Sequence, residues 1–135
     1  IGQRTLRIDC DVLNADGGTR CASITGAYVA ACLALQRAFA ANGAVYTLPP
    51  RLAAVSIGIV DGRVVTDLCY DEDHRADVDL NFVALETGIV EVQGTAEGNP
   101  FSEAQLTEMV GHGRAACRQL FNLQSRLLTP GEATP

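Results

Sequence analysis

The feature that most constrains the fold is a change of hydrophobic period at residues 16–20, Asp-Gly-Gly-Thr-Arg. Before this junction, residues 5–13 alternate apolar and polar side chains, which predicts a β-strand. From Ser23 onward, apolar residues recur every three or four positions, which predicts an amphipathic helix that ends near Asn42-Gly43. The sequence therefore predicts a strand that passes through two glycines into a helix.

The glycine junction has the properties of an anion-binding site. Gly17 and Gly18 allow backbone N–H groups to converge on one point, and the helix N-terminus adds positive potential there. Thr19 supplies a hydroxyl, and Arg20 supplies a permanently charged guanidinium that suits phosphate oxygens. For this segment alone, an ordinary turn with an incidental arginine is an equally good interpretation, because short glycine motifs are weakly specific.

The rest of the chain predicts a group of strands and a second long helix. The strands are residues 52–60, 63–70, 76–85 and 89–93, with Asp61-Gly62 as a hairpin turn and residues 71–75 as a polar loop. A capping box of Ser102 and Gln105 predicts the start of the last helix, in which Gly111 and Gly113 indicate close packing. The predicted order is β-α-β-β-β-β-α, a two-layer α+β fold with both helices on one face of the sheet.

Charge and hydropathy exclude some classes of protein. A net charge of −6 argues against a self-sufficient nucleic-acid binder with a broad basic surface, although it does not exclude an RNA enzyme whose basic surface lies elsewhere. No stretch approaches the roughly 18 apolar residues that span a bilayer, and no signal segment opens the chain. We therefore expect no membrane association.

The cysteines predict a reducing compartment. There are five, without a C-x-x-C pair, and they lie in apolar segments, so we expect reduced, buried thiols in a cytoplasmic protein. Cys21 differs because it adjoins Arg20 near a helix start, where the pKa of a thiol tends to fall. The alternative is that Cys21 is a small filler residue, which is the commoner role for such a cysteine.

A cluster of acidic residues predicts a second polar site. Strand alternation places Asp77 and Asp79 on the same side, and the preceding loop can fold Asp73 over them. Such carboxylates suit Mg²⁺ or Mn²⁺, which would offset their repulsion. In isolation, a solvated acidic loop with His74 and Arg75 as local partners is the better-supported alternative. Together with a phosphate site, the acids indicate phosphoryl transfer.

Taken together, these segments resemble the ribonuclease PH family of phosphate-dependent 3′→5′ exoribonucleases. Four stretches carry the resemblance: residues 8–12 (IDCDV), residues 15–27 (ADGGTR followed by ASITGA), residues 71–81 (DED and ADVDLN) and residues 91–102 (EVQGTAEG followed by FS). The resemblance follows the chain in order and covers only the C-terminal part of the family, roughly half. It implies that residues 1–128 are the C-terminal part of a ribonuclease PH domain, and we expect residues 129–135 to form a flexible tail.

The resemblance also implies roles for particular residues. Gly18, Thr19 and Arg20 match the phosphate-binding segment of the family, and Asp73 and Asp79 match the acids credited with catalysis and with binding Mg²⁺ (or Mn²⁺). With Arg20, these two acids would be the catalytic residues. Asp77 stands where the family more often has Glu, and Cys21 where it often has Thr. Neither difference removes a named ligand.

The implied activity is phosphorolysis, in which inorganic phosphate is the co-substrate that shortens the 3′ ends of tRNA precursors and releases nucleoside diphosphates. The implied fold resembles domain 2 of ribosomal protein S5, and the implied assembly is a homo-hexameric ring of dimers. The alternative is a catalytically silent ring subunit that binds RNA as a scaffold, although retention of Thr19, Arg20, Asp73 and Asp79 argues against it. An unrelated anion-binding module would fit only the local motifs.

Overall fold

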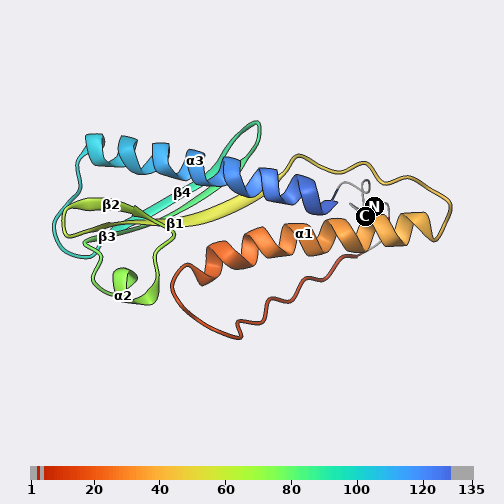
Figure 1. Ribbon diagram of the computed structural model, residues 1–135, viewed down its shortest axis with the longest axis horizontal. Helices are drawn as coiled ribbons and strands as arrows, with labels where there is room; N and C mark the ends of the chain where they lie inside the picture. The colour runs from red at the N-terminus through yellow and green to blue at the C-terminus, as the bar shows by residue number, and fades with distance from the viewer. Residues whose placement is uncertain (1–2, 4, 129–135) are drawn as a thin grey trace, which may run out of the picture.

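The computed structural model describes residue 3 and residues 5–128, so the predicted tail at residues 129–135 lies outside the described part. An antiparallel sheet lies between two long helices (Figure 1). The elements in chain order are α1 (Thr19–Ala40), β1 (Leu52–Val60), β2 (Arg63–Thr66), α2 (Tyr70–Asp73), β3 (Val78–Leu85), β4 (Gly88–Ala96) and α3 (Glu103–Leu128). The α+β class is therefore confirmed.

The sheet has the spatial order β2-β1-β3-β4, and all of its neighbouring strands are antiparallel. The predicted hairpin between β1 and β2 is present, and Asp61 and Gly62 both have positive φ, as a type I′ turn requires. Within the sheet, Ser56 lies opposite Asn81, and Gly58 lies opposite Asp79. This register places polar residues of β1 and β3 on one shared face.

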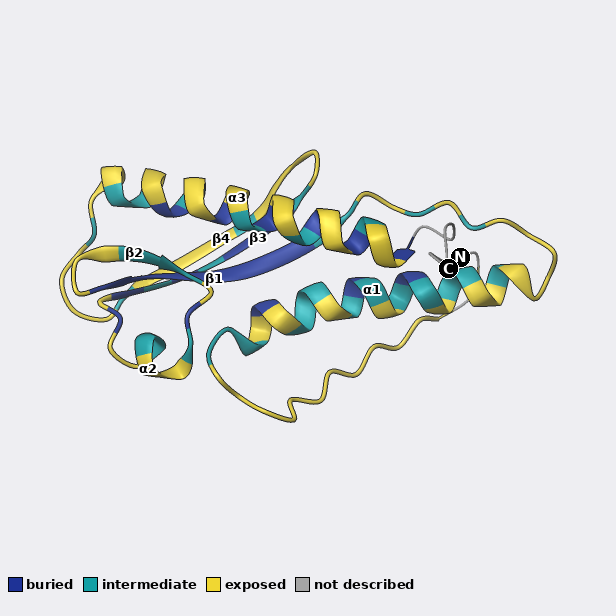
Figure 2. Cartoon of the chain, in the orientation of Figure 1, coloured by how far each residue is buried: buried dark blue, intermediate teal, exposed yellow. Residues whose placement is uncertain are grey.

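The main core lies between the other face of the sheet and α3. Ile57, Leu80, Phe82 and Met109 are all fully buried in it. At the start of α3, the predicted capping box is confirmed. The backbone N–H of Ser102 donates to Gln105 Oε1 (2.8 Å), and the backbone N–H of Gln105 donates to Ser102 Oγ (3.2 Å). Figure 2 shows the resulting burial along β1 and the inner side of α3.

The expectation that both helices cover one face of the sheet is wrong. Ala53 of β1 packs in the core beneath α3, whereas its neighbour Ala54 packs against Cys21 of α1. Successive strand residues point to opposite faces, so the two helices contact opposite faces of β1. Thr25 fastens α1 to the strand, because its hydroxyl accepts from the Ala54 N–H (2.9 Å) and donates to the Ala54 carbonyl (3.1 Å).

Three predicted boundaries also differ from the structure. Residues 5–13 are extended and exposed but form no strand, because neither edge strand of the sheet, β2 or β4, pairs with them. β2 ends at Thr66 rather than residue 70, since Asp67 has a positive φ of 62° and turns the chain away. The predicted polar loop begins with the short helix α2, in which the Glu72 carboxylate accepts the Cys69 N–H (3.0 Å).

Candidate active site

The glycine turn directs the N-terminus of α1 toward a polar region. Gly17 has a φ of 74°, and a Cβ at this position would lie 2.1 Å from the Leu68 carbonyl oxygen, so only glycine fits. Gly18 has a φ of 53° and is the N-cap of α1. The first helical bond runs from the Ala22 N–H to the Gly18 carbonyl (2.9 Å), so the N–H groups of residues 19–21 precede the helical ladder. This geometry supports the predicted anion site.

Asp16 connects the glycine turn with the acidic segment. Its Oδ1 accepts the backbone N–H of Tyr70, the first residue of α2, at 2.9 Å. This bond joins the start of α1 to the helix that carries Asp73. Sequence reasoning assigned no role to Asp16, although a short carboxylate immediately before two glycines is a common partner for a nearby backbone N–H.

Arg20 makes a two-point ion pair with Glu91 of β4. Nη1 lies 2.7 Å from Oε1, and Nη2 lies 3.1 Å from Oε2. The hydrogen bond and the opposite charge raise the pKa of Arg20, and the hydrogen bond to Arg20 lowers the pKa of Glu91. Both side chains are partly exposed, at 49% and 37% respectively. Glu91 lay within a family-like stretch of the sequence, but nothing in the sequence marked it as the partner of Arg20.

Asp79 lies in β3, half-buried, and Asp73 ends α2. Burial is the largest cause that raises the pKa of Asp79, followed by the negative charges of Asp73 and Glu97. The predicted approach of Asp73 to Asp79 is therefore reflected in their electrostatic coupling. Asp77 is exposed and precedes β3.

The basic residues beside the acids turn elsewhere. Arg75 Nη1 lies 3.6 Å from Asp61 Oδ2, and its Nε donates to the Asp71 carbonyl (2.8 Å). His74 stacks on Tyr70 with ring centroids 5.4 Å apart. The solvated-loop alternative expected His74 and Arg75 to be local partners of the acids, but their contacts are with Tyr70, Asp71 and Asp61 rather than with the Asp73 and Asp79 carboxylates.

The residues present fit a magnesium ion only if another ligand contributes. Across residues 3 and 5–128, no group of three or more His, Cys, Asp or Glu side chains is placed to hold a metal. Asp73 and Asp79 are two carboxylates whose mutual repulsion a cation would offset. Mg²⁺ typically takes one or two carboxylates and completes its shell with water and substrate phosphates, so this pair suits it.

The expectation of a lowered pKa at Cys21 is wrong. Burial raises the pKa of this thiol to about 11, and the opposing effect of Arg20 is smaller. Its Sγ donates to Asn81 Oδ1 at 2.9 Å, so Cys21 fills space and links α1 to β3. All five cysteines are free, but Cys10 is exposed because its segment lacks a partner strand.

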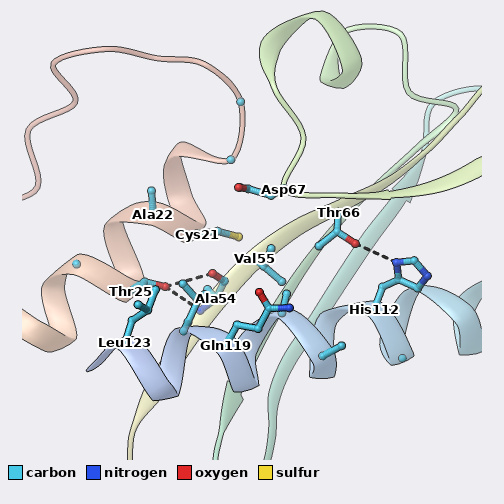
Figure 3. A pocket seen from close by; sticks show the side chains of 17 residues that line it. Cys21, Ala22, Thr25, Ala54, Val55, Thr66, Asp67, His112, Gln119 and Leu123 are labelled. Carbon is cyan, nitrogen blue, oxygen red and sulfur yellow. Dashed lines mark hydrogen bonds between the residues drawn. The ribbon is translucent and has the colours of Figure 1, made fainter. Parts of the chain in front are cut away.

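A cleft of about 840 Å³ opens beside the glycine turn, between α1 and α3 (Figure 3). Gly17, Gly18 and Cys21 line it from the glycine turn and the start of α1. His112 lines it from α3 and pairs through Nδ1 with the Thr66 hydroxyl (3.0 Å). Neither Asp73 nor Asp79 lines this cleft, so the predicted acids lie outside it.

Beneath that turn lies one polar group that sequence reasoning missed. The Ser56 hydroxyl is buried and has no hydrogen-bond partner among the described residues. A Cβ on Gly18 would lie 2.8 Å from it, so the hydroxyl sits directly under the N-cap of α1. A serine in an otherwise apolar strand is the only signal in the sequence that could have indicated it.

Comparison with known proteins connects this geometry to a family. Residues 51–116 match the model of the 3′ exoribonuclease family, domain 2. The chain is 52% identical to ribonuclease PH of Nocardia farcinica over 131 residues, which are 95% of this chain and 51% of that protein. It is also 52% identical to ribonuclease PH of Corynebacterium glutamicum over 132 residues, 95% of this chain and 53% of that protein. The chain thus spans about half the length of these curated relatives.

Two solved structures share the fold. Rrp46 of rice (Oryza sativa) aligns with a TM-score of 0.70 at 16% identity, over 87% of this chain and 51% of that one. A chain of the Archaeoglobus fulgidus exosome, solved with RNA bound to the active site, aligns with a TM-score of 0.59 at 24% identity, over 82% of this chain and 44% of that one. The fold, the family model and the curated relatives agree: the chain belongs to the ribonuclease PH family of 3′ exoribonucleases.

Proposed function

We propose that this chain supplies about half of a phosphate-dependent 3′→5′ exoribonuclease that trims the 3′ ends of tRNA precursors. The observation that carries the proposal is that the glycine turn lies next to the elements that carry Asp73 and Asp79. The Asp16–Tyr70 bond ties the glycine turn to α2, which carries Asp73. Asp79 also lies close enough to α1 that its charge raises the pKa of Cys21. An anion site beside a pair of carboxylates is the arrangement that phosphoryl transfer needs.

In this reaction, inorganic phosphate is the nucleophile. Gly18, Thr19 and Arg20 would hold it through backbone N–H groups, a hydroxyl and the guanidinium. A phosphate oxygen bonds to the phosphorus of the last phosphodiester, and the bond from that phosphorus to the preceding 3′ oxygen breaks. The products are a nucleoside diphosphate and an RNA one nucleotide shorter with a 3′ hydroxyl. Orientation and charge compensation supply most of the catalysis in such transfers.

Asp73 and Asp79 would hold Mg²⁺, or Mn²⁺, next to this phosphate. When bound, the ion offsets the negative charge that develops on the transferred phosphorus group. Burial raises the pKa of Asp79 most, and the charges of Asp73 and Glu97 raise it further. This shift supports the role, because a nearby cation stabilises an ionised carboxylate in such surroundings. The Arg20 guanidinium would offset part of the same negative charge.

The remaining features are proposed on the family relationship. RNA would be the partner. The basic protein surface that contacts the RNA would lie in the part of the protein that this acidic chain does not include. The assembly would be a homo-hexameric ring of dimers in the cytoplasm. None of the described helices is long and apolar enough to cross a membrane. A silent scaffold subunit is the second candidate, and the exosome-like folds of the structural neighbours favour it only weakly.

The test uses a fusion in which the N-terminal half of a ribonuclease PH relative precedes this chain. With a 3′-extended tRNA precursor, phosphate and Mg²⁺, the fusion should release nucleoside diphosphates. Arg20→Ala should raise the phosphate requirement and slow release by about tenfold or more, since a charge-assisted contact is lost. Arg37→Ala, in the last turn of α1, is the matched control and should leave both unchanged.

The products distinguish the alternatives. Nucleoside monophosphates would identify water as the nucleophile and contradict phosphorolysis. RNA binding without any product would support the scaffold. Unchanged phosphate dependence in Arg20→Ala would show that Arg20 does not bind the attacking phosphate.

A further inference from the structure

The ion pair between Arg20 and Glu91 also affects how Arg20 can bind phosphate at the proposed site. Arg20 lies in the first turn of α1, and Glu91 lies in β4, where it pairs opposite Val83 of β3. The pair therefore joins the start of a helix to the fourth strand of the sheet. β4 pairs with β3 on both sides of a register shift that lies between Val83 and Ala84, and Glu91 is itself paired with Val83, so the sheet rather than the glycine turn holds the backbone at Glu91.

The geometry of the pair leaves donors on Arg20 free for another anion. Each carboxylate oxygen of Glu91 takes one bond, from Nη1 at 2.7 Å and from Nη2 at 3.1 Å. A guanidinium carries five N–H donors, so the Nε–H and one N–H on each terminal nitrogen lie outside these two bonds. The edge formed by Nε and one terminal nitrogen matches two oxygens of a phosphate. Glu91 and a phosphate can thus bind the same guanidinium at different edges.

Stability alone gives little reason for this pair. Both side chains are partly exposed, and exposed ion pairs typically contribute little to stability. Its larger effect is on conformation, because an unpaired arginine on a helix surface samples many rotamers. A two-point bond to a strand restricts Arg20 to one arrangement before phosphate arrives, which reduces the ordering that binding requires.

We propose that Glu91 is a positioning residue for phosphate, which holds the Arg20 guanidinium in its binding orientation and leaves its Nε edge available. The inference rests on the proposed function, in which Arg20 contacts the attacking phosphate. It assigns Glu91 no contact with phosphate or RNA. The effect of Glu91 should therefore fall on phosphate affinity and should act only through Arg20.

The experiment measures steady-state kinetics of the fusion that carries this chain, with phosphate varied at saturating RNA and RNA varied at saturating phosphate. Glu91→Gln keeps the size of the side chain but loses its charge and one of its two acceptor oxygens. It should raise the KM for phosphate about threefold to tenfold, as expected for the loss of one preorganised contact. The kcat at saturating phosphate and the KM for RNA should stay within about twofold of the parent values.

Glu86→Gln is the matched control. Glu86 lies at the turn between β3 and β4 and also pairs with an arginine, Arg51. Both side chains of this pair are partly exposed. The substitution removes the same charge from the same kind of pair on the same sheet. It should leave the KM for phosphate unchanged.

A double variant separates positioning from a general effect on the fold. If Glu91 acts through Arg20, then Arg20→Ala with Glu91→Gln should have the same KM for phosphate as Arg20→Ala alone. A further increase in the double variant would overturn the proposal. A lower KM for phosphate in Glu91→Gln would also overturn it, because Glu91 would then compete with phosphate for the guanidinium.

Failure of the proposed function gives a different pattern. If Arg20→Ala leaves phosphate dependence unchanged, the assignment of Arg20 fails, and the role of Glu91 fails with it. If Arg20→Ala raises the KM for phosphate and Glu91→Gln does not, only the inference about Glu91 is wrong.

Discussion

Two glycines in α3 should respond in opposite directions to the same substitution. Gly111 and Gly113 are two residues apart in the helix, and neither has a positive φ. A Cβ added at Gly111 meets no atom within 4 Å. A Cβ added at Gly113 would lie 2.5 Å from Cγ of Phe82 and 2.9 Å from Cδ1 of Ile57. Both of those side chains are 0% exposed, so neither can move aside into solvent.

The magnitude follows from two opposing effects. In a helix, Ala is more favourable than Gly by about 1 kcal/mol, and this gain applies to both positions. Overpacking of a dense core costs roughly 1–3 kcal/mol, and this cost applies only at Gly113. Gly111→Ala should therefore raise the free energy of unfolding by about 0.5–1 kcal/mol. Gly113→Ala should lower it by up to about 2 kcal/mol, so the difference between the variants reports packing alone.

Urea unfolding of the two variants and the parent, in the same fusion background, measures this difference. The midpoints should move in opposite directions with unchanged m-values, because neither substitution changes the surface exposed on unfolding. Equal shifts of the same sign would refute the reasoning, since they would mean that α3 does not press on Phe82 at Gly113. A changed m-value would indicate a different denatured state rather than a packing effect.

Two further predictions concern the candidate site. Asp79→Asn should abolish most turnover without lowering the free energy of unfolding. The reason is that burial, together with Asp73 and Glu97, already raises the pKa of Asp79 and disfavours its ionised form in the folded state. Asp77→Asn, at an exposed position, should reduce turnover less, and equal loss of turnover in both variants at saturating Mg²⁺ would contradict this assignment. Cys21 should resist iodoacetamide at neutral pH because burial raises its pKa to about 11, whereas exposed Cys10 should be alkylated. Mass spectrometry of the folded chain measures both reactions, and equal alkylation of the two cysteines would refute this prediction.

Short sequence motifs correctly predicted the start of α3 and the β1–β2 hairpin. Ser102 and Gln105 marked the start of α3, and Asp61-Gly62 marked the hairpin, because both devices depend on residues only a few positions apart. The close packing predicted at Gly113 is confirmed, but Gly111 has open space. Spacing along a helix cannot distinguish two such positions when the face that each one presents to the sheet is unknown.

The placement of helices and partners could not be predicted in the same way. The sequence does not state which face of the sheet α1 covers, because Ala53 and Ala54 are equally small and apolar yet point to different helices. The sequence also did not reveal the partner of Arg20. Glu91 is distant in sequence, and it comes within reach only because β4 pairs with β3 beside the start of α1. Burial of Cys21, which reverses its expected pKa shift, is also a tertiary effect.

Residues 5–13 present the sharpest conflict between pattern and structure, and the conflict has a physical explanation. Their alternation of Leu6 and Ile8 with charged residues is typical of a half-buried strand, yet they are exposed and unpaired. A strand requires hydrogen bonds from a neighbour, and neither edge strand of this sheet supplies them. The curated relatives are about twice as long as this chain. If this chain is part of a protein of that length, we expect residues 5–13 to pair with a strand outside this sequence. That pairing would also fix the approach to Gly17, and so it would hold the proposed phosphate-binding turn in place.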